Sequence, residues 1–169
     1  MTTNQPSSVA TIAADAGLGI VFAAGLAFTA YMLMDSWGGN SWLFNCLVGV
    51  ALSLAALARR IDRLWTTAVG LGVAALAILV SSLAELPQEP GPVAALALAV
   101  LVGSAIRTLS AGRAGTIAAA GIAVVTGAWL SGGLTSVTLF HTVSLVAAVA
   151  VGLRLRLLDI QLDAAHNPR

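Results

Sequence analysis

Charged side chains are scarce in this chain, and lysine is absent. Asp, Glu, Lys and Arg together make up 9% of the 169 residues, whereas soluble domains carry roughly 25%. Hydrophobic residues make up 59%, and a water-soluble fold could not bury so much apolar surface. The composition therefore indicates an integral membrane protein.

Motifs for catalysis and cofactor binding are also lacking. The single cysteine, Cys46, lies in an apolar run, which excludes a disulfide framework and a thiolate metal site. The sequence contains no glycine-rich phosphate loop, no nucleophile elbow and no basic patch for nucleic acid. We therefore expect a protein that is not an enzyme, holds no cofactor or metal, and binds no nucleic acid.

The longest stretch without charge runs from Ala114 to Leu153. A helix crosses a bilayer with about 20 residues, so this stretch predicts two crossings, separated at residues 131–133. Shorter charge-free intervals upstream predict four more. We expect an all-α integral membrane bundle of six transmembrane helices with short loops, at about 16–35, 41–58, 64–83, 92–109, 114–131 and 136–155. Residues 1–14 are expected to be a disordered lead-in, 15–156 the six-helix domain, and 157–169 a cytoplasmic tail.

All the arginines fall on one side of this six-helix arrangement. An odd number of helices would divide them between both faces of the membrane. Because positive charge favours the cytoplasmic side, both termini are expected in the cytoplasm, with the protein in the plasma membrane. The acidic residues Asp35, Glu85 and Glu89 are expected to mark the outer face.

Five residues near the expected outer ends are candidates for sensing a stimulus or ligand: Asp35, Trp37, Trp42, Trp129 and His141. The tryptophans are typical of headgroup anchors, and a ligand-stacking role is the alternative. His141 is the only histidine within an expected span, so it either hydrogen-bonds a neighbouring helix or senses pH or a ligand. No acid is expected near the middle of the bilayer, which argues against an ion-coupled transporter.

The end of the last helix carries an apolar stripe of Leu155, Leu158 and Leu162. This spacing of three and four residues is typical of a helix that seeks a partner. A homodimer or another membrane protein could dock through the last helix and the tail. A frayed helix end is the alternative.

Four segments resemble the N-terminal membrane region of actinobacterial two-component sensor histidine kinases. They are Asp15 at the opening of the first helix, LARRIDR (57–63), PGPVAALALAVLVGSAIRTLSAGRAG (90–115) and VAVGLRLRLLDIQLDAAH (149–166). The resemblance implies a signalling role, with the last helix leading towards a dimerising coiled coil. The family's kinase domains have no counterpart among these residues. His166 lacks the surroundings of the family's phosphoacceptor, so that role is not transferred to it.

The function expected from these observations is a non-catalytic, signalling-type membrane sensor or interaction module. The lipid bilayer is its first partner. One alternative is a small transporter or channel-like subunit. Another is an accessory structural subunit of a larger membrane complex.

Overall fold

The computed structural model describes residues 7–36, 41–84, 86 and 89–166. Over these residues the chain forms six α-helices and one turn of 3-10 helix, with no strand. The elements are α1 (Ser7–Ser36), α2 (Ser41–Leu57), η1 (Ala58–Arg60), α3 (Arg63–Leu83), α4 (Pro92–Thr108), α5 (Ala111–Gly132) and α6 (Ser136–His166). The predicted all-α bundle of six helices is confirmed.

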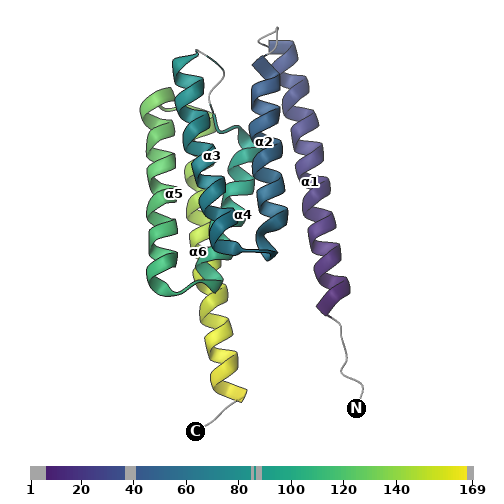
Figure 1. The fold of residues 1–169 in the computed structure, drawn as a ribbon, viewed down its shortest axis with the longest axis vertical. Coiled ribbons are helices and arrows are strands. Elements are labelled where there is room, and N and C mark those ends of the chain that lie inside the picture. Colours follow the sequence, from purple (N-terminus) through teal and green to yellow (C-terminus); the bar gives the residue numbers. More distant parts are fainter. Residues whose placement is uncertain (1–6, 37–40, 85, 87–88, 167–169) are drawn as a thin grey trace.

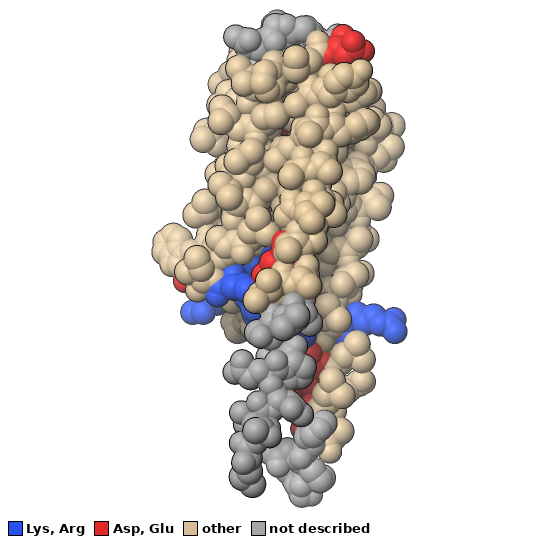
Figure 2. All heavy atoms as spheres, turned by 90° about the vertical axis from the view of Figure 1, so that its right-hand side faces the viewer, with Lys and Arg blue, Asp and Glu red and all other residues tan. Residues whose placement is uncertain are grey.

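The helices run alternately up and down, so α1 begins and α6 ends at the same end of the bundle (Figure 1). The turn between α2 and α3 and the turn between α4 and α5 lie at this end as well, with most of the arginines; we call it the arginine end. Figure 2 shows arginine side chains towards this end and an acidic side chain at the opposite one. We call the opposite end the distal end.

Local sequence explains several helix ends. The Asp62 carboxylate caps α3 by accepting hydrogen bonds from the backbone N–H groups of Leu64 and Trp65, both at 3.0 Å. Proline begins α4, at a position where its missing N–H costs nothing. Gly133 ends α5 with φ of 68°, a left-handed conformation that favours glycine.

The central helix is α4, which contacts α1, α2, α3, α5 and α6. Four of its nine buried side chains are alanines, and Ala94, Ala97 and Ala105 are almost fully inaccessible. Small side chains let neighbouring membrane helices approach closely, so dispersion contacts accumulate around α4. The core of the bundle is therefore built around this helix.

Five helices, all except α4, are long and apolar enough to cross a membrane. Their outward faces carry large exposed apolar side chains, such as Ile20, Phe28, Leu79 and Val146. Contiguous apolar surface on this scale is stable in lipid and not in water. The chain is therefore a multi-pass helical membrane protein.

Two helix ends differ from the prediction. Because α1 begins at Ser7, residues 7–14 are helical and do not form a disordered lead-in. α6 continues to His166, so most of the expected tail is also helix and not a frayed end. Both extensions carry polar residues. The length of a charge-free stretch indicates how much of a helix lies in hydrocarbon, but a helix can continue beyond the hydrocarbon with polar residues.

α4 begins deeper in the bundle than the distal end of α3 (Figure 1). The residues just before α4 are inside the bundle, with Glu89 only 1% exposed and Pro90 also buried. Residues 89–91 occupy the depth at which α4 would otherwise have its first turns. This explains why α4 has only 17 residues.

Candidate functional site

Glu89 is the only fully buried acidic side chain among the described residues. The Asn45 side chain of α2 donates a hydrogen bond from Nδ2 to Glu89 Oε1 at 2.7 Å. The backbone N–H of Gly91 donates to Glu89 Oε2 at 2.9 Å. Each carboxylate oxygen therefore has a donor, and the pair ties α2 to the connection that begins α4.

Glu89 does not present its charge at the surface of the outer face as expected, because its side chain points into the bundle. Burial raises the pKa of Glu89 from 4.5 to about 7, and the two hydrogen bonds only partly oppose that rise. A carboxyl group with this pKa changes its charge near neutral pH. The residue can therefore bind or release a proton under ordinary conditions.

Gly91 is required by the close approach of the Asn45 side chain. A Cβ atom at Gly91 would collide with the Asn45 amide nitrogen. Any larger residue would displace the amide that binds Glu89. Asn45 therefore packs directly against the segment Glu89–Gly91, and a side chain at position 91 would disturb this packing.

His141 of α6 completes this region, which we call the distal cluster: Asn45, Glu89, Gly91 and His141. The imidazole is 5% exposed, and its ring faces the backbone of Pro90 and Gly91. Its Nε2 atom has no hydrogen-bond partner within the described part of the chain. The ring and Pro90 also line a small cavity of about 20 Å³ whose other walls are almost entirely apolar.

Trp129, a second predicted site residue, lies across the distal hairpin of α5 and α6. Its indole Nε1 donates a hydrogen bond to Thr142 Oγ1 at 3.0 Å. Thr142 in turn donates to the backbone oxygen of Thr138 at 2.8 Å. This contact gives Trp129 a packing role within the hairpin, and its partner Thr142 directly follows His141 in sequence.

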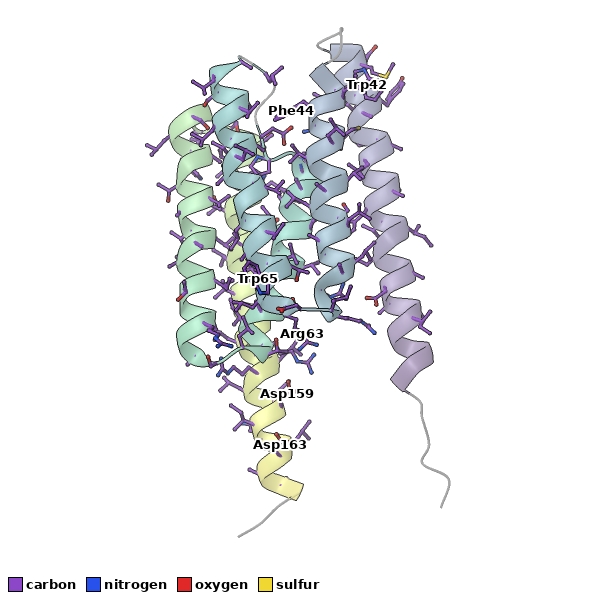
Figure 3. All side chains as sticks on the ribbon, viewed as in Figure 1. Trp42, Phe44, Arg63, Trp65, Asp159 and Asp163 are labelled. Carbon is purple, nitrogen blue, oxygen red and sulfur yellow. The ribbon has the colours of Figure 1, made fainter. Side chains whose placement is uncertain are left out.

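Two further predicted residues lie on the hairpin of α1 and α2. Asp35 is exposed near the end of α1, and Trp42 lies in the first turn of α2 (Figure 3). Trp37 lies outside the described residues. Because α1 contacts α2 and α4 while α6 contacts α4 and α5, the four predicted residues that the structure describes do not converge on one pocket. Of these four, His141 alone belongs to the distal cluster.

Glu89 and Asn45 are the site residues that sequence reasoning missed. Asn45 is a buried amide in the largely apolar helix α2. Since buried polar groups need hydrogen-bond partners, Asn45 in an apolar stretch indicates that a second polar group lies within hydrogen-bonding distance of it. The sequence alone does not identify that group, because Glu89 lies 44 positions away.

Ion pairs fix the arginine end. Asp15 of α1 contacts Arg59 at 2.7 Å and Arg60 at 3.0 Å. Arg107, in the last turn of α4, donates from Nε and Nη2 to both oxygens of Asp159 at 2.8 and 3.1 Å. The second pair joins α4 to α6 beyond the bundle, as the position of Asp159 in Figure 3 illustrates.

The distal cluster contains two titratable side chains, Glu89 and His141. Across residues 7–36, 41–84, 86 and 89–166, no three His, Cys, Asp or Glu side chains gather where they could hold a metal ion. A buried carboxyl group and a buried imidazole instead lie on either side of the short segment Pro90–Gly91. Glu89, with a pKa of about 7, can change its protonation state without a cofactor.

Comparisons with protein families, with characterised proteins and with solved structures found no match to this chain.

Proposed function

We propose that this protein is a non-catalytic membrane sensor in which the distal cluster responds to protons and α6 transmits the response. The observation that carries the proposal is the continuity of α6 from Ser136 to His166. One helix includes His141 in the distal cluster, Asp159 in the ion pair at the arginine end, and the projecting tail. A small translation or rotation at one end would therefore reach the other.

Protonation of Glu89 supplies a physical trigger. The neutral carboxyl group fits a buried site, whereas the carboxylate carries a charge that is poorly solvated there. Charging Glu89 strains the contact between the Glu89–Gly91 segment and its neighbours. Those neighbours are Asn45 and the Cys46 thiol of α2, and His141 of α6. Since α4 begins directly after this segment and packs along α6, the strain acts at the α4–α6 contact.

The proposed role places the distal end outside the cell and the arginine end in the cytoplasm of a plasma membrane. We expect a reporter that is active only in the cytoplasm to work when fused after Asp62 or Arg169, and to be inactive when fused after Glu89. The reason is that positively charged turns are retained on the cytoplasmic side. Activity after Glu89, or none after Arg169, would contradict this orientation.

The sensing role predicts a movement of the tail with pH. Spin labels on Ile61→Cys and Asp163→Cys, in a Cys46→Ala background, report the distance between the α2–α3 turn and the tail. In nanodiscs we expect this distance to change between pH 5 and pH 8 with a midpoint near 7, because Glu89 has a pKa of about 7. Electron paramagnetic resonance measures the change directly.

The matched variants separate sensing from packing. Glu89→Gln keeps the size of the side chain and removes its charge, so the pH response should disappear. His141→Gln keeps hydrogen bonding and should alter the amplitude or midpoint of the response. If Glu89→Gln retained the full response, Glu89 would not be the trigger. If His141→Gln changed neither the response nor the stability, His141 would be only a packing residue.

Ion-coupled transport is the second candidate, and the burial of Glu89 is what favours it. Membrane transporters often place a carboxyl group among helices for coupling. The sequence predicts no acid near the middle of the bilayer, whereas Glu89 is buried among the helices. Reconstituted vesicles with a pH gradient test this directly. A flux that depends on Glu89 would establish transport and replace the sensor proposal.

A further inference from the structure

A large groove runs along α4 and α6 towards the arginine end. Its volume is about 1040 Å³. α4 contributes one face from Leu96 to Thr108, and α6 contributes one face from Val143 to Asp159. The turn that holds Arg59, Arg60 and Arg63 closes one end of the groove.

Small side chains create this space. Ala99 of α4 and Ala147 of α6 line the groove where larger side chains would fill it, whereas Gly103 and Gly152 line it where the backbones of α4 and α6 touch. The other residues that line the groove away from the arginines are also largely apolar, such as Leu96, Val100 and Val143. Ala99 lines both the groove and the small cavity beside His141. One end of the groove therefore lies close to the distal cluster.

The two ends of the groove differ in charge. Four arginines line the end near the chain termini: Arg59, Arg60, Arg63 and Arg107. Two carboxylates contact three of them, because Asp15 pairs with Arg59 and Arg60, and Asp159 with Arg107. Asp62 beside Arg63 is directed at the backbone of α3, which it caps. The arginine end of the groove therefore keeps an excess of positive charge next to the apolar part of the groove.

The dimensions match one leaflet of a bilayer. From Val143 to Asp159 the helix rises about 24 Å. Half of a hydrocarbon core is about 15 Å, and the headgroup region adds several more. The arginines then lie at headgroup level, and the apolar part of the groove reaches the middle of the bilayer.

We propose that this groove binds one anionic phospholipid from the leaflet at the arginine end. The phosphate lies against Arg63 and its neighbours Arg60 and Arg107, and one acyl chain lies in the groove, over the contact between α4 and α6. Guanidinium groups match phosphate oxygens in geometry and in charge. Basic pockets between transmembrane helices bind anionic lipid headgroups in this way. The bound lipid would also contact α4 and α6 together, the two helices that pack most extensively in the bundle.

The test uses the full chain, purified in a mild detergent and titrated with phosphatidylglycerol or with phosphatidylcholine of the same acyl chains. Native mass spectrometry counts the lipids that remain bound. We expect one phosphatidylglycerol to be retained and phosphatidylcholine to bind at least about tenfold more weakly. Glycerol phosphate, which has the charge but no acyl chain, should bind far more weakly still.

Two pairs of variants locate the site. Arg63→Gln leaves the Asp15 ion pairs intact and should weaken phosphatidylglycerol binding about fivefold, whereas Arg154→Gln, on an exposed part of α6 outside the groove, should not. Ala147→Phe fills the groove from an exposed position and should block the acyl chain. Ala150→Phe is equally exposed on α6 but does not line the groove, so binding should persist.

Several outcomes would overturn the proposal. Equal binding of the two lipids would remove the role of the arginines. Full binding of glycerol phosphate alone would show a site for a soluble anion, without an acyl chain. Equal effects of Ala147→Phe and Ala150→Phe would place the lipid elsewhere. A dimer that excludes lipid from the groove would assign this surface to a second copy of the chain.

Discussion

The free energy of unfolding is expected to fall by about 3 kcal/mol as the pH rises from 4 to 8, because of Glu89 alone. The pKa of Glu89 is about 7 in the folded protein and 4.5 when the group is free in water. Below pH 4.5 both states hold the proton, and this contribution to stability is fully present. Between pH 4.5 and 7 the unfolded chain loses the proton while the folded chain keeps it, so rising pH favours unfolding. Above pH 7 the contribution has been lost.

Unfolding in detergent at a series of pH values, followed by tryptophan fluorescence, measures this slope. Other carboxylates also titrate in this range, so the difference between the wild type and Glu89→Gln isolates the contribution of Glu89. Glu89→Gln should have the flatter profile. Asp163→Asn changes an exposed acid on the end of α6 and should keep the wild-type profile. Identical slopes for the wild type and Glu89→Gln would show that Glu89 is not buried as described.

Gly152→Ala is expected to destabilise the bundle by about 1–3 kcal/mol, although only one methyl group is added. A Cβ atom at Gly152 would lie 2.8 Å from the backbone oxygen of Gly103 and 3.2 Å from Ile106 Cβ. The oxygen belongs to the backbone of α4, so the clash cannot be relieved by turning a side chain. α4 and α6 must separate, and the dispersion contacts between them weaken. The loss is measured as a lower unfolding midpoint in detergent.

Gly115→Ala is the matched control on α5. Nothing lies within 4 Å of a Cβ atom at Gly115. Alanine there should leave the packing intact and gain about 0.5–1 kcal/mol from its higher helix propensity. If both alanine variants had the same stability, α4 and α6 would not be in close contact at Gly152.

The number and order of the helices could be predicted from the sequence because hydrocarbon excludes charge. Arg59, Arg63 and Arg113 bound apolar stretches of the right length, and each stretch is a helix in the structure. The ends of α1 and α6 could not be predicted in this way. Residues beyond the hydrocarbon are free to carry charge and remain helical, as Asp159 and Asp163 do.

The distal cluster was less predictable, because it depends on contacts between distant segments. Glu85 and Glu89 look alike in the segment ELPQEPGP, and only the position of Asn45 distinguishes Glu89. The histidine was recognisable because a buried imidazole in a membrane helix is rare. The close contact at Gly152 was equally hidden, since glycines are scattered throughout the chain and several face open space. Pairing between helices decides which of these residues matter.

The part of α6 beyond Arg156 acts as a lever arm. It extends to His166, about 15 Å past the arginine end. A tilt of about 10° where α6 leaves the bundle would displace its tip by about 3 Å, more than the movement at the pivot itself. The Arg107–Asp159 ion pair lies close to that pivot and joins α6 to α4 there. A docked partner would therefore respond most strongly if it held the stripe of Leu158 and Leu162, and least if it held the helix near the membrane.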